Sequence, residues 1–214
     1  MNATGKYIDA EWMGSPLILC NQRSRDWTHP YEYQGNGSML CNAGCGIFSL
    51  INVAHFFGKD PCTPEELADF SCRWGGRGDD GTDRPALLAA MEQRGVAKRF
   101  GFSYRGDGLR NDLSVLAKHL ADGNAALCNL RVGHIVALIG YRDGSGEPQV
   151  LAADPFSEST DSRVLPAVRE VIPGSEVISP IRNDSNRLCG WQVSYALYWC
   201  ALCTVRDFNL LHRI

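Results

Sequence analysis

No stretch of this sequence is apolar for the roughly 20 consecutive residues that a membrane-spanning helix needs. Charge of either sign is not in excess, because 21 basic and 24 acidic side chains leave a formal charge of −3. A surface that holds nucleic acid or an anionic membrane requires a basic excess, so we expect neither partner. The N-terminal segment also lacks the basic-then-apolar order of a signal peptide. This favours a cytoplasmic protein, with export as the alternative.

The composition is that of an ordinary globular protein, with 44% hydrophobic and 21% charged residues in a chain of 214. These fractions exclude a disordered chain, a collagen and a coiled coil. The length suits one well-packed hydrophobic core. We therefore expect a single domain over residues 1–214.

Cysteine is the unusual component. There are nine, at positions 20, 41, 45, 62, 72, 128, 189, 200 and 203. A chain this long does not need disulfide staples, so one interpretation is a reduced protein that uses cysteine as a small core residue. The other is that one thiol is a nucleophile, which leaves eight to be paired or reduced. Cys200 and Cys203 form a CxxC pair without a second pair, so no metal site is expected.

Helices are predicted for the first half of the chain. Residues 45–57 are apolar on nearly every side, which is typical of a helix buried in the middle of a domain, and Gly58 suits the position after it. A second helix is expected to begin after Thr63, which is placed to form a capping box. A third is expected over 85–94, and a fourth with Asn111 as its N-cap.

Strands are predicted for the second half, over residues 126–132, 134–141, 149–153, 169–181 and 191–205. Helices followed by strands predict an α+β fold, in which N-terminal helices pack on a mostly antiparallel C-terminal sheet. Either half alone would expose a wide apolar face, which again favours one domain.

Cys45 lies between Gly44 and Gly46, where a loop meets the buried helix. The free N–H groups and the dipole at a helix start favour a thiolate over a thiol. The two glycines allow another backbone to come close. The alternative is a structural cysteine at a helix start that needs small neighbours. On the same helix, Ser49 and Asn52 continue a polar stripe from Cys45 at helical spacing.

A thiolate nucleophile needs a histidine to hold the proton. Among the five histidines, His134 is the best candidate, because it begins the apolar strand HIVALIGY, where an imidazole is out of place. His55 lies about 15 Å of helical rise from Cys45, too far for a hydrogen bond. The other three are expected in a loop (His29), at the surface (His119) and near a frayed end (His212).

Folding the chain about its turn near residues 144–146 places His134 opposite residues 154–158. Asp154 stands directly before Pro155, where the strand must end. Its carboxylate is placed to accept the second imidazole N–H and to fix the tautomer. The alternative is that this Asp-Pro pair only opens a turn.

Acyl transfer also needs donors for the oxyanion. Gln22 is the best side-chain candidate, because its amide can donate and its loop leads to Cys45. The backbone N–H of Cys45 would be the second donor. Gln34, which is nearer in sequence, remains an alternative.

Several segments together resemble the bacterial peptidases related to the bacteriocin-processing double-glycine peptidases. They are NQRSRDW at 21–27, NAGCGIFSLINVAHFFG at 42–58, TPEELADF at 63–70, Gly-Thr at 81–82, GHIVALIGY at 133–141 and Asp-Pro at 154–155. The resemblance covers about residues 17–157 and implies a papain-like cysteine peptidase fold. The family's chain order of glutamine, cysteine, histidine and aspartate becomes Gln22, Cys45, His134 and Asp154. It implies an enzyme that hydrolyses a peptide or protein substrate through a thioester, without a cofactor or metal.

Two features depart from this pattern. Ile47-Phe48 replace the usual Pro-Thr after GCG, which is expected to change the substrate fit, and residues 158–214 have no match. The unmatched part is expected to add strands to the same domain or to line the substrate cleft. The polar run 73–81 is expected either to rim that cleft or to be a solvated loop. The same four residues would also serve a glutamine deamidase or acyltransferase, and the remaining alternative is a catalytically silent peptide-binding module.

Overall fold

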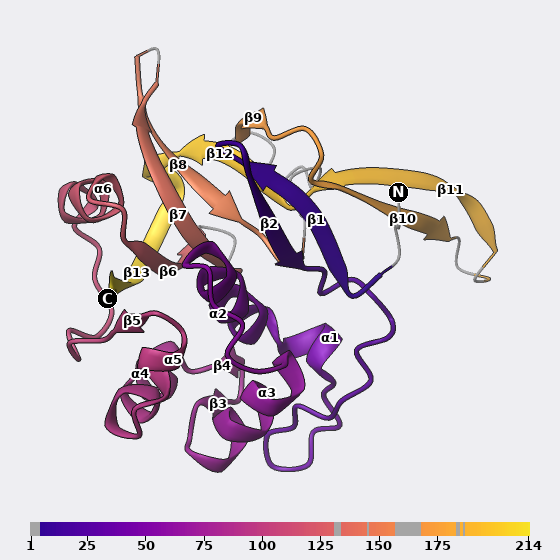
Figure 1. Ribbon diagram of the computed structural model, residues 1–214. Coiled ribbons are helices and arrows are strands. Elements are labelled where there is room, and N and C mark those ends of the chain that lie inside the picture. The colour runs from indigo at the N-terminus through magenta and orange to yellow at the C-terminus, as the bar shows by residue number, and fades with distance from the viewer. Residues whose placement is uncertain (1–4, 131–133, 145, 157–167, 183–184, 186) are drawn as a thin grey trace.

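The computed structural model describes residues 5–130, 134–144, 146–156, 168–182, 185 and 187–214 (Figure 1). At its centre is a seven-stranded sheet in the order β5-β13-β6-β7-β8-β12-β9, and every neighbouring pair is antiparallel. In chain order these strands are β5 (Phe102–Ser103), β6 (Ala125–Leu130), β7 (Ile135–Asp143), β8 (Pro148–Ala153), β9 (Val168–Val171), β12 (Leu197–Ala201) and β13 (Val205–Arg213). Helices packed on this sheet confirm the predicted α+β class.

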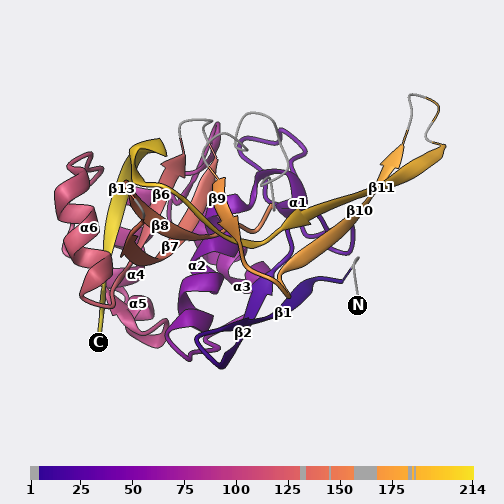
Figure 2. The ribbon, with the colours of Figure 1, turned by 90° about the horizontal axis from the view of Figure 1, so that it is seen from above.

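Both faces of the sheet are covered. Helix α2 (Cys45–Phe56) lies on one face and α6 (Leu113–Ala121) on the other, as the view from above shows (Figure 2). Each face buries its own apolar cluster, with Ile139 on the α2 side and Leu138 on the α6 side. Successive strand residues point to opposite faces, so a strand buried on both faces is apolar at nearly every position.

The predicted helices form, with one correction. α2 is buried from Gly46 to Ala54, and α3 (Pro64–Arg73) begins with the expected capping box between Thr63 and Glu66. The N-cap of α6 is Asp112 and not Asn111: its carboxylate accepts the N–H groups of Ser114 and Val115. A carboxylate is favoured at a helix start by the dipole as well as by these hydrogen bonds.

The remaining helical and short elements lie between these. They are α1 (Leu40–Ala43), β3 (Arg77–Gly78), β4 (Gly81–Thr82), α4 (Arg84–Gln93), α5 (Val96–Arg99) and the 3₁₀ turn η3 (Leu202–Thr204). The expected helix over 85–94 is α4.

The chain beyond residue 158 supplies strands to the central sheet. β13 inserts between β5 and β6, and β12 lies between β8 and β9. The single strand expected over 169–181 is wrong, because a turn at Gly174 (φ 86°) separates β9 from the next strand. The single strand expected over 191–205 is likewise divided, between β11 (Leu188–Tyr195), β12 and η3. That the whole chain is one domain stays a prediction.

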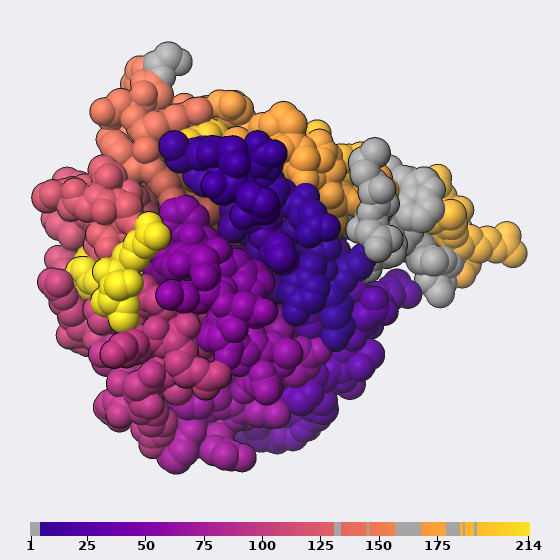
Figure 3. All heavy atoms as spheres, in the orientation of Figure 1, coloured from indigo at the N-terminus to yellow at the C-terminus, as the bar shows by residue number. Residues whose placement is uncertain are grey.

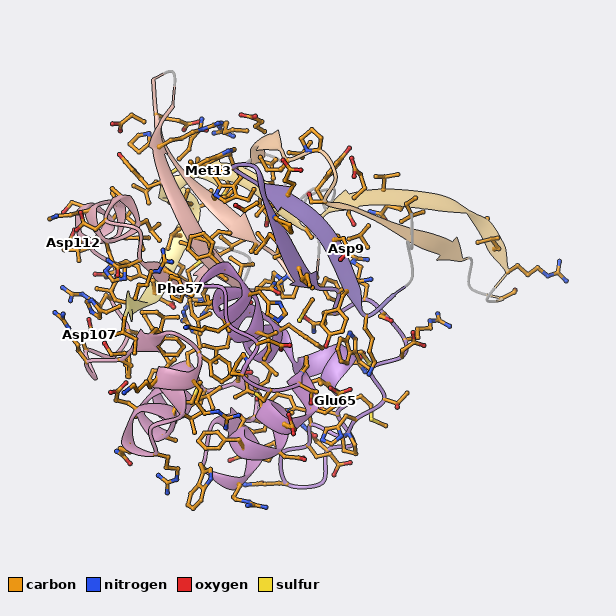
Figure 4. All side chains as sticks on the ribbon, viewed as in Figure 1. Asp9, Met13, Phe57, Glu65, Asp107 and Asp112 are labelled. Carbon is orange, nitrogen blue, oxygen red and sulfur yellow. The ribbon has the colours of Figure 1, made fainter. Side chains whose placement is uncertain are left out.

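An N-terminal hairpin precedes the helices, which the predicted order of helices first and strands afterwards did not contain. It consists of β1 (Tyr7–Trp12) and β2 (Ser15–Cys20), joined through Met13 and Gly14, whose φ angles are 51° and 75°. Figure 4 shows Met13 at this turn. β2 packs on α2, and the hairpin forms part of the molecular surface above the helices (Figure 3).

A second hairpin lies outside the central sheet. Strands β10 (Glu176–Arg182) and β11 (Leu188–Tyr195) form a separate two-stranded sheet and project from the body as an arm (Figures 1 and 2). Val177 and Ser194 at its base are buried, whereas Val193 is exposed.

Candidate active site

Cys45 is the first residue of α2 and is only partly buried. Close contacts explain the glycines on either side of it. A Cβ on Gly44 would lie 2.5 Å from the carbonyl oxygen of Leu40, and a Cβ on Gly46 would lie 2.6 Å from the Cβ of Thr82. We expected the backbone of another segment at both positions. The structure shows the preceding turn at Gly44 and a side chain at Gly46.

His134 and Asp154 meet where β7 begins and β8 ends. The Nε2 atom of His134 lies 2.8 Å from Oδ1 of Asp154. The β7–β8 register pairs Ala137 with Ala153, with a bulge between Leu138 and Gly140. The hairpin therefore brings the two residues together, as their spacing predicted. With Nε2 on the carboxylate, Nδ1 is the ring nitrogen that remains for Cys45.

The Asp154 carboxylate is fully buried and held by several donors. Oδ1 accepts the N–H of Phe156 at 2.8 Å as well as the His134 contact, and Oδ2 accepts the hydroxyl of Tyr198 at 2.9 Å. The backbone N–H of Asp154 also donates to the Ala196 carbonyl at 2.8 Å. A buried carboxylate is tolerated only when such partners replace its water. Sequence reasoning missed Tyr198, because no local pattern around residue 198 marks it.

The three central side chains shift one another's pKa. Burial raises the pKa of the Cys45 thiol, but a hydrogen bond from His134, the His134 charge and nearby backbone groups outweigh it and lower that pKa. Burial lowers the pKa of His134, yet Asp154 and Cys45 raise it well above 6.5. Burial raises the pKa of Asp154, and the His134 charge with three hydrogen bonds lowers it below 3.8. These opposite shifts favour a thiolate–imidazolium pair beside an ionised carboxylate.

Gln22 lies next to this group and is 2% exposed. Its backbone N–H donates to the carbonyl of Pro155 at 2.7 Å, directly after Asp154, and its side-chain Nε2 donates to the Cys41 carbonyl at 3.1 Å. Its buried Oε1 has no hydrogen-bond partner among the described residues. Gln34, the alternative donor, is exposed on a turn with a φ of 51°.

The polar stripe of α2 connects the helix to the segments that carry the other candidates. The Ser49 hydroxyl donates to the carbonyl of Ile135 at 3.2 Å, one residue after His134. The Asn52 Oδ1 accepts the N–H of Cys20 at 2.7 Å, two residues before Gln22. Both side chains are fully buried. One face of α2 thus presents Cys45 and also anchors the histidine and glutamine segments.

An aromatic ring lies beside the histidine. The ring centroids of Phe156 and His134 are 5.9 Å apart in an edge-on arrangement. The Arg23 guanidinium stacks over the same Phe156 ring at 4.3 Å, and its Nε donates to the Phe156 carbonyl. These contacts tie the loop of Gln22 to the loop of Asp154.

The other four histidines have unrelated partners. His29 contacts Asp69 at 2.8 Å, and His55 contacts the carbonyl of Ile18 at 2.8 Å. His119, expected at the surface, is in fact buried, and its Nε2 donates to the carbonyls of Ala125 and Leu211. The remaining one, His212, packs edge-on against His119.

The run 73–81 is not a plain solvated loop, and its place at the rim of a substrate cleft stays a prediction. It contains the short β3–β4 hairpin, which the buried Arg77 pins through the carbonyls of Tyr31 and Gly81. Thr82 at its end packs against Gly46 and contacts the Tyr31 hydroxyl at 3.0 Å. The hairpin therefore supports the start of α2.

The Ile47-Phe48 departure lies inside the core. Both side chains are fully buried, and the Phe48 ring packs 4.9 Å from that of Trp27. These two side chains therefore do not contact a substrate directly, contrary to the simplest form of the predicted effect on substrate fit. They pack α2 against the core.

No disulfide joins any of the nine cysteines in the structure, which describes all nine. Cys200 is buried in β12, whereas Cys203 is exposed, so the two members of the CxxC pair have different surroundings. Within the part of the chain that the structure describes, no three His, Cys, Asp or Glu side chains gather as metal ligands.

A family model, the Peptidase_C39 like family, matches residues 27–170. The chain belongs to the Peptidase_C39 like family. Membership supports a function of the cysteine-peptidase type and confirms the resemblance found in the sequence. The expected span of about 17–157 is corrected, because the match begins at residue 27 and includes residues 158–170. Cys45, His134 and Asp154 lie inside the matched span, whereas Gln22 and Tyr198 lie outside it.

Comparisons of this Peptidase_C39 like chain with curated proteins and with solved structures gave no match. Among the described residues, no helix has both the length and the hydropathy required to cross a membrane.

Proposed function

We propose that this protein is a cysteine peptidase that hydrolyses a peptide or amide bond with Cys45 as nucleophile. His134 takes the thiol proton and Asp154 orients His134. The observation that carries the proposal is the partly buried His134–Asp154 contact of 2.8 Å beside a thiol whose pKa is lowered at a helix start. This combination is the one that thiol nucleophiles require.

In the proposed mechanism the Cys45 thiolate attacks the substrate carbonyl carbon, and the carbonyl electrons move to its oxygen. The Gln22 amide and the Cys45 backbone N–H stabilise this oxyanion. His134 then donates its proton to the leaving amine as the C–N bond breaks, which leaves a thioester. His134 next removes a proton from water, which attacks the thioester and releases the acid and the Cys45 thiolate.

The assignment of Gln22 rests on its position. Its Nε2 carries two hydrogens, one of which donates to Cys41, so the second is the one assigned to the oxyanion. The loop is fixed on both sides, by Pro155 and by Asn52 through Cys20. Pre-positioned donors of this kind do not need to reorganise during the reaction.

The test is hydrolysis of a peptide library by the purified protein, with cleavage products identified by mass spectrometry. We expect cleavage by the wild type and none by Cys45→Ala, while Cys41→Ala, which removes a neighbouring thiol, retains cleavage. Equal product from Cys45→Ala and wild type would contradict the proposal. Acyl transfer or glutamine deamidation without peptide cleavage would identify the related acyltransferase or deamidase chemistry. Peptide binding without any reaction would identify the catalytically silent module.

The finer proposal concerns substrate and location. By resemblance to the bacteriocin-processing peptidases of bacteria, the substrate would be a leader peptide cleaved after a double glycine. The test compares cleavage of two peptides that differ only in having Gly-Gly or Ala-Ala at the cleavage position.

A cytoplasmic location remains part of the proposal. A thiol count on the native protein, under denaturing and non-reducing conditions, gives nine for a reduced protein and one for four disulfides plus a free nucleophile.

A further inference from the structure

Strand β12 contacts the candidate triad from outside the family-matched span, which ends at residue 170. It does so at two points on the same residue. The Ala196 carbonyl, just before β12, accepts the backbone N–H of Asp154 at 2.8 Å, and the Tyr198 hydroxyl donates to Asp154 Oδ2 at 2.9 Å. Tyr198 pairs with Ala152, so it and Asp154 are diagonal neighbours on one face of the sheet.

The two oxygens of Asp154 have separate partners. Oδ1 faces His134 and the Phe156 N–H, and Oδ2 faces Tyr198. The terminal torsion of an aspartate is broad, so a carboxylate held at one oxygen alone can rotate. A donor on Oδ2 restricts that rotation together with the donors on Oδ1, and so helps to set the direction in which Oδ1 accepts.

Tyr198 is suited to this role because it can act only as a donor here. Its side chain is fully buried, and burial together with the Asp154 charge raises its pKa well above 10.0, which keeps the hydroxyl protonated. Its ring packs in the apolar cluster on the α6 side of the sheet, with Leu138 and Val150. The hydroxyl is therefore held by a rigid neighbourhood.

We propose that Tyr198 is a positioning residue, which holds Oδ2 of Asp154 so that Oδ1 stays aimed at His134 Nε2. The inference rests on the proposed function of Cys45, His134 and Asp154. It gives the chain beyond residue 170 a part in the site, since β12 orients the aspartate and, through it, the imidazole that faces the thiol.

The experiment measures the alkylation rate of Cys45 by iodoacetamide between pH 4 and 9, with the labelled peptide quantified by mass spectrometry. Tyr198→Phe keeps the ring and removes only the hydroxyl. A less well oriented imidazole stabilises the thiolate less. The acid limb of the profile, which is the pH range where the alkylation rate rises with pH, should therefore move up by about one pH unit. At a fixed pH below this range, labelling should be roughly tenfold slower. Peptide hydrolysis should lose about tenfold in kcat with little change in KM.

The matched control is Tyr104→Phe. Tyr104 is also buried, and its hydroxyl accepts the N–H of Gly108 at 3.0 Å. It lies in the loop that leads from β5 to the start of α6, and β5 is the edge strand of the sheet that is distant from β12. Figure 4 labels Asp107 in this loop and Asp112 at its end. A loss of stability alone would lower the melting temperature of either variant without moving the acid limb.

A double-mutant cycle tests whether Tyr198 acts through Asp154. In the Asp154→Ala background, Tyr198→Phe should cause no further shift of the limb, because the group it positions is absent. If Tyr198→Phe does not fold, the wild type gives an alternative measurement. The Tyr198 hydroxyl proton should be protected from exchange and its NMR shift should change when His134 titrates, and an unchanged shift would overturn the proposal.

The outcomes separate the two proposals. If His134→Ala leaves the wild-type profile unchanged, the proposed function fails. If His134→Ala removes the low-pH reactivity but Tyr198→Phe behaves like Tyr104→Phe, only the positioning role of Tyr198 is overturned.

Discussion

At the scale of single residues, Asp154 carries a charge that is taken fully out of water. Its carboxylate is fully buried, and the imidazolium of His134 is the charge that offsets it. Removal of one partner of a buried ion pair leaves the other charge without compensation. The stability of the protein should therefore depend on pH through these two groups.

The first prediction concerns the direction in which the free energy of unfolding changes with pH. The folded pKa of Asp154 is lowered from 3.8, so its stabilisation is complete above 3.8 and is lost as the pH falls through the folded pKa. The folded pKa of His134 is raised above 6.5, so its stabilisation is present below 6.5 and is lost as the pH rises through the folded pKa. Asp154→Asn should cost about 3 kcal/mol in the free energy of unfolding near pH 6. Urea unfolding of both proteins between pH 2 and 9 checks this, and a cost independent of pH would contradict it.

The second prediction concerns the oxyanion. Gln22→Ala should lower kcat for peptide hydrolysis about 100-fold and change KM little, because the lost hydrogen bond forms in the transition state. Gln34→Ala is the matched control, since Gln34 is exposed on its turn, and it should leave both constants unchanged. Steady-state kinetics measure both, and equal effects of the two substitutions would rule out Gln22 as the donor.

The residues of the candidate site differ in how far the sequence predicts them. Cys45 is marked by its glycines, and His134 and Asp154 by the hairpin spacing. Tyr198 depends on the register of β12 against β8, which is a long-range pairing. A long-range register is not encoded in the residues around position 198, so sequence reasoning could not find it.

At the scale of elements, helix α2 positions most of the candidate site. Its start presents Cys45, and Ser49 and Asn52 on the same stripe hold the segments of His134 and Gln22. The β3–β4 hairpin packs on its first turn through Thr82. A displacement of this turn would move the thiol relative to the imidazole, where a shift of about 1 Å is costly.

The third prediction tests that contact. Gly46→Ala places a Cβ 2.6 Å from the Cβ of Thr82, so it should destabilise the fold by about 2 kcal/mol and slow the alkylation of Cys45. Gly78→Ala in the same hairpin is the control, because the nearest atom to its Cβ is 3.8 Å away. Urea unfolding and iodoacetamide labelling compare the two variants. Equal behaviour would show that the Thr82 contact does not fix the start of α2.

Elements with local signals are predictable, and those that depend on pairing partners are less so. The capping box at Thr63 and the apolar face of α2 are local. The β1–β2 hairpin alternates buried and exposed residues, which is a sequence pattern typical of strands. Its turn, however, places Met13 at a φ of 51°, where methionine is an unusual residue. The turn was therefore not evident from composition.

At the scale of the whole molecule, the sheet is completed by strands distant in sequence. β13 lies between β5 and β6, and β12 pairs with β8. Their removal would leave the edges of β6 and β8 without hydrogen-bond partners and open both apolar clusters. The family-matched span alone therefore lacks part of the core.

The fourth prediction follows from this. A chain ending at residue 170 should show no cooperative thermal unfolding by near-UV circular dichroism, because it lacks β12 and β13. In the control variant, residues 179–192 of the projecting arm are replaced by an Asn-Gly turn, which joins the paired residues Ile178 and Val193. This variant keeps β12 and β13 and should unfold cooperatively. A cooperative transition in the chain that ends at 170 would contradict this account of the sheet.

The central claim is that Cys45 is a thiolate activated by His134, and alkylation with iodoacetamide at pH 6 tests it most directly. Ordinary thiols react slowly at this pH, since their pKa is near 8.5. The account predicts that Cys45 is labelled selectively among the nine cysteines and that His134→Ala abolishes this selectivity. Uniform labelling of several cysteines, unchanged in His134→Ala, would contradict it.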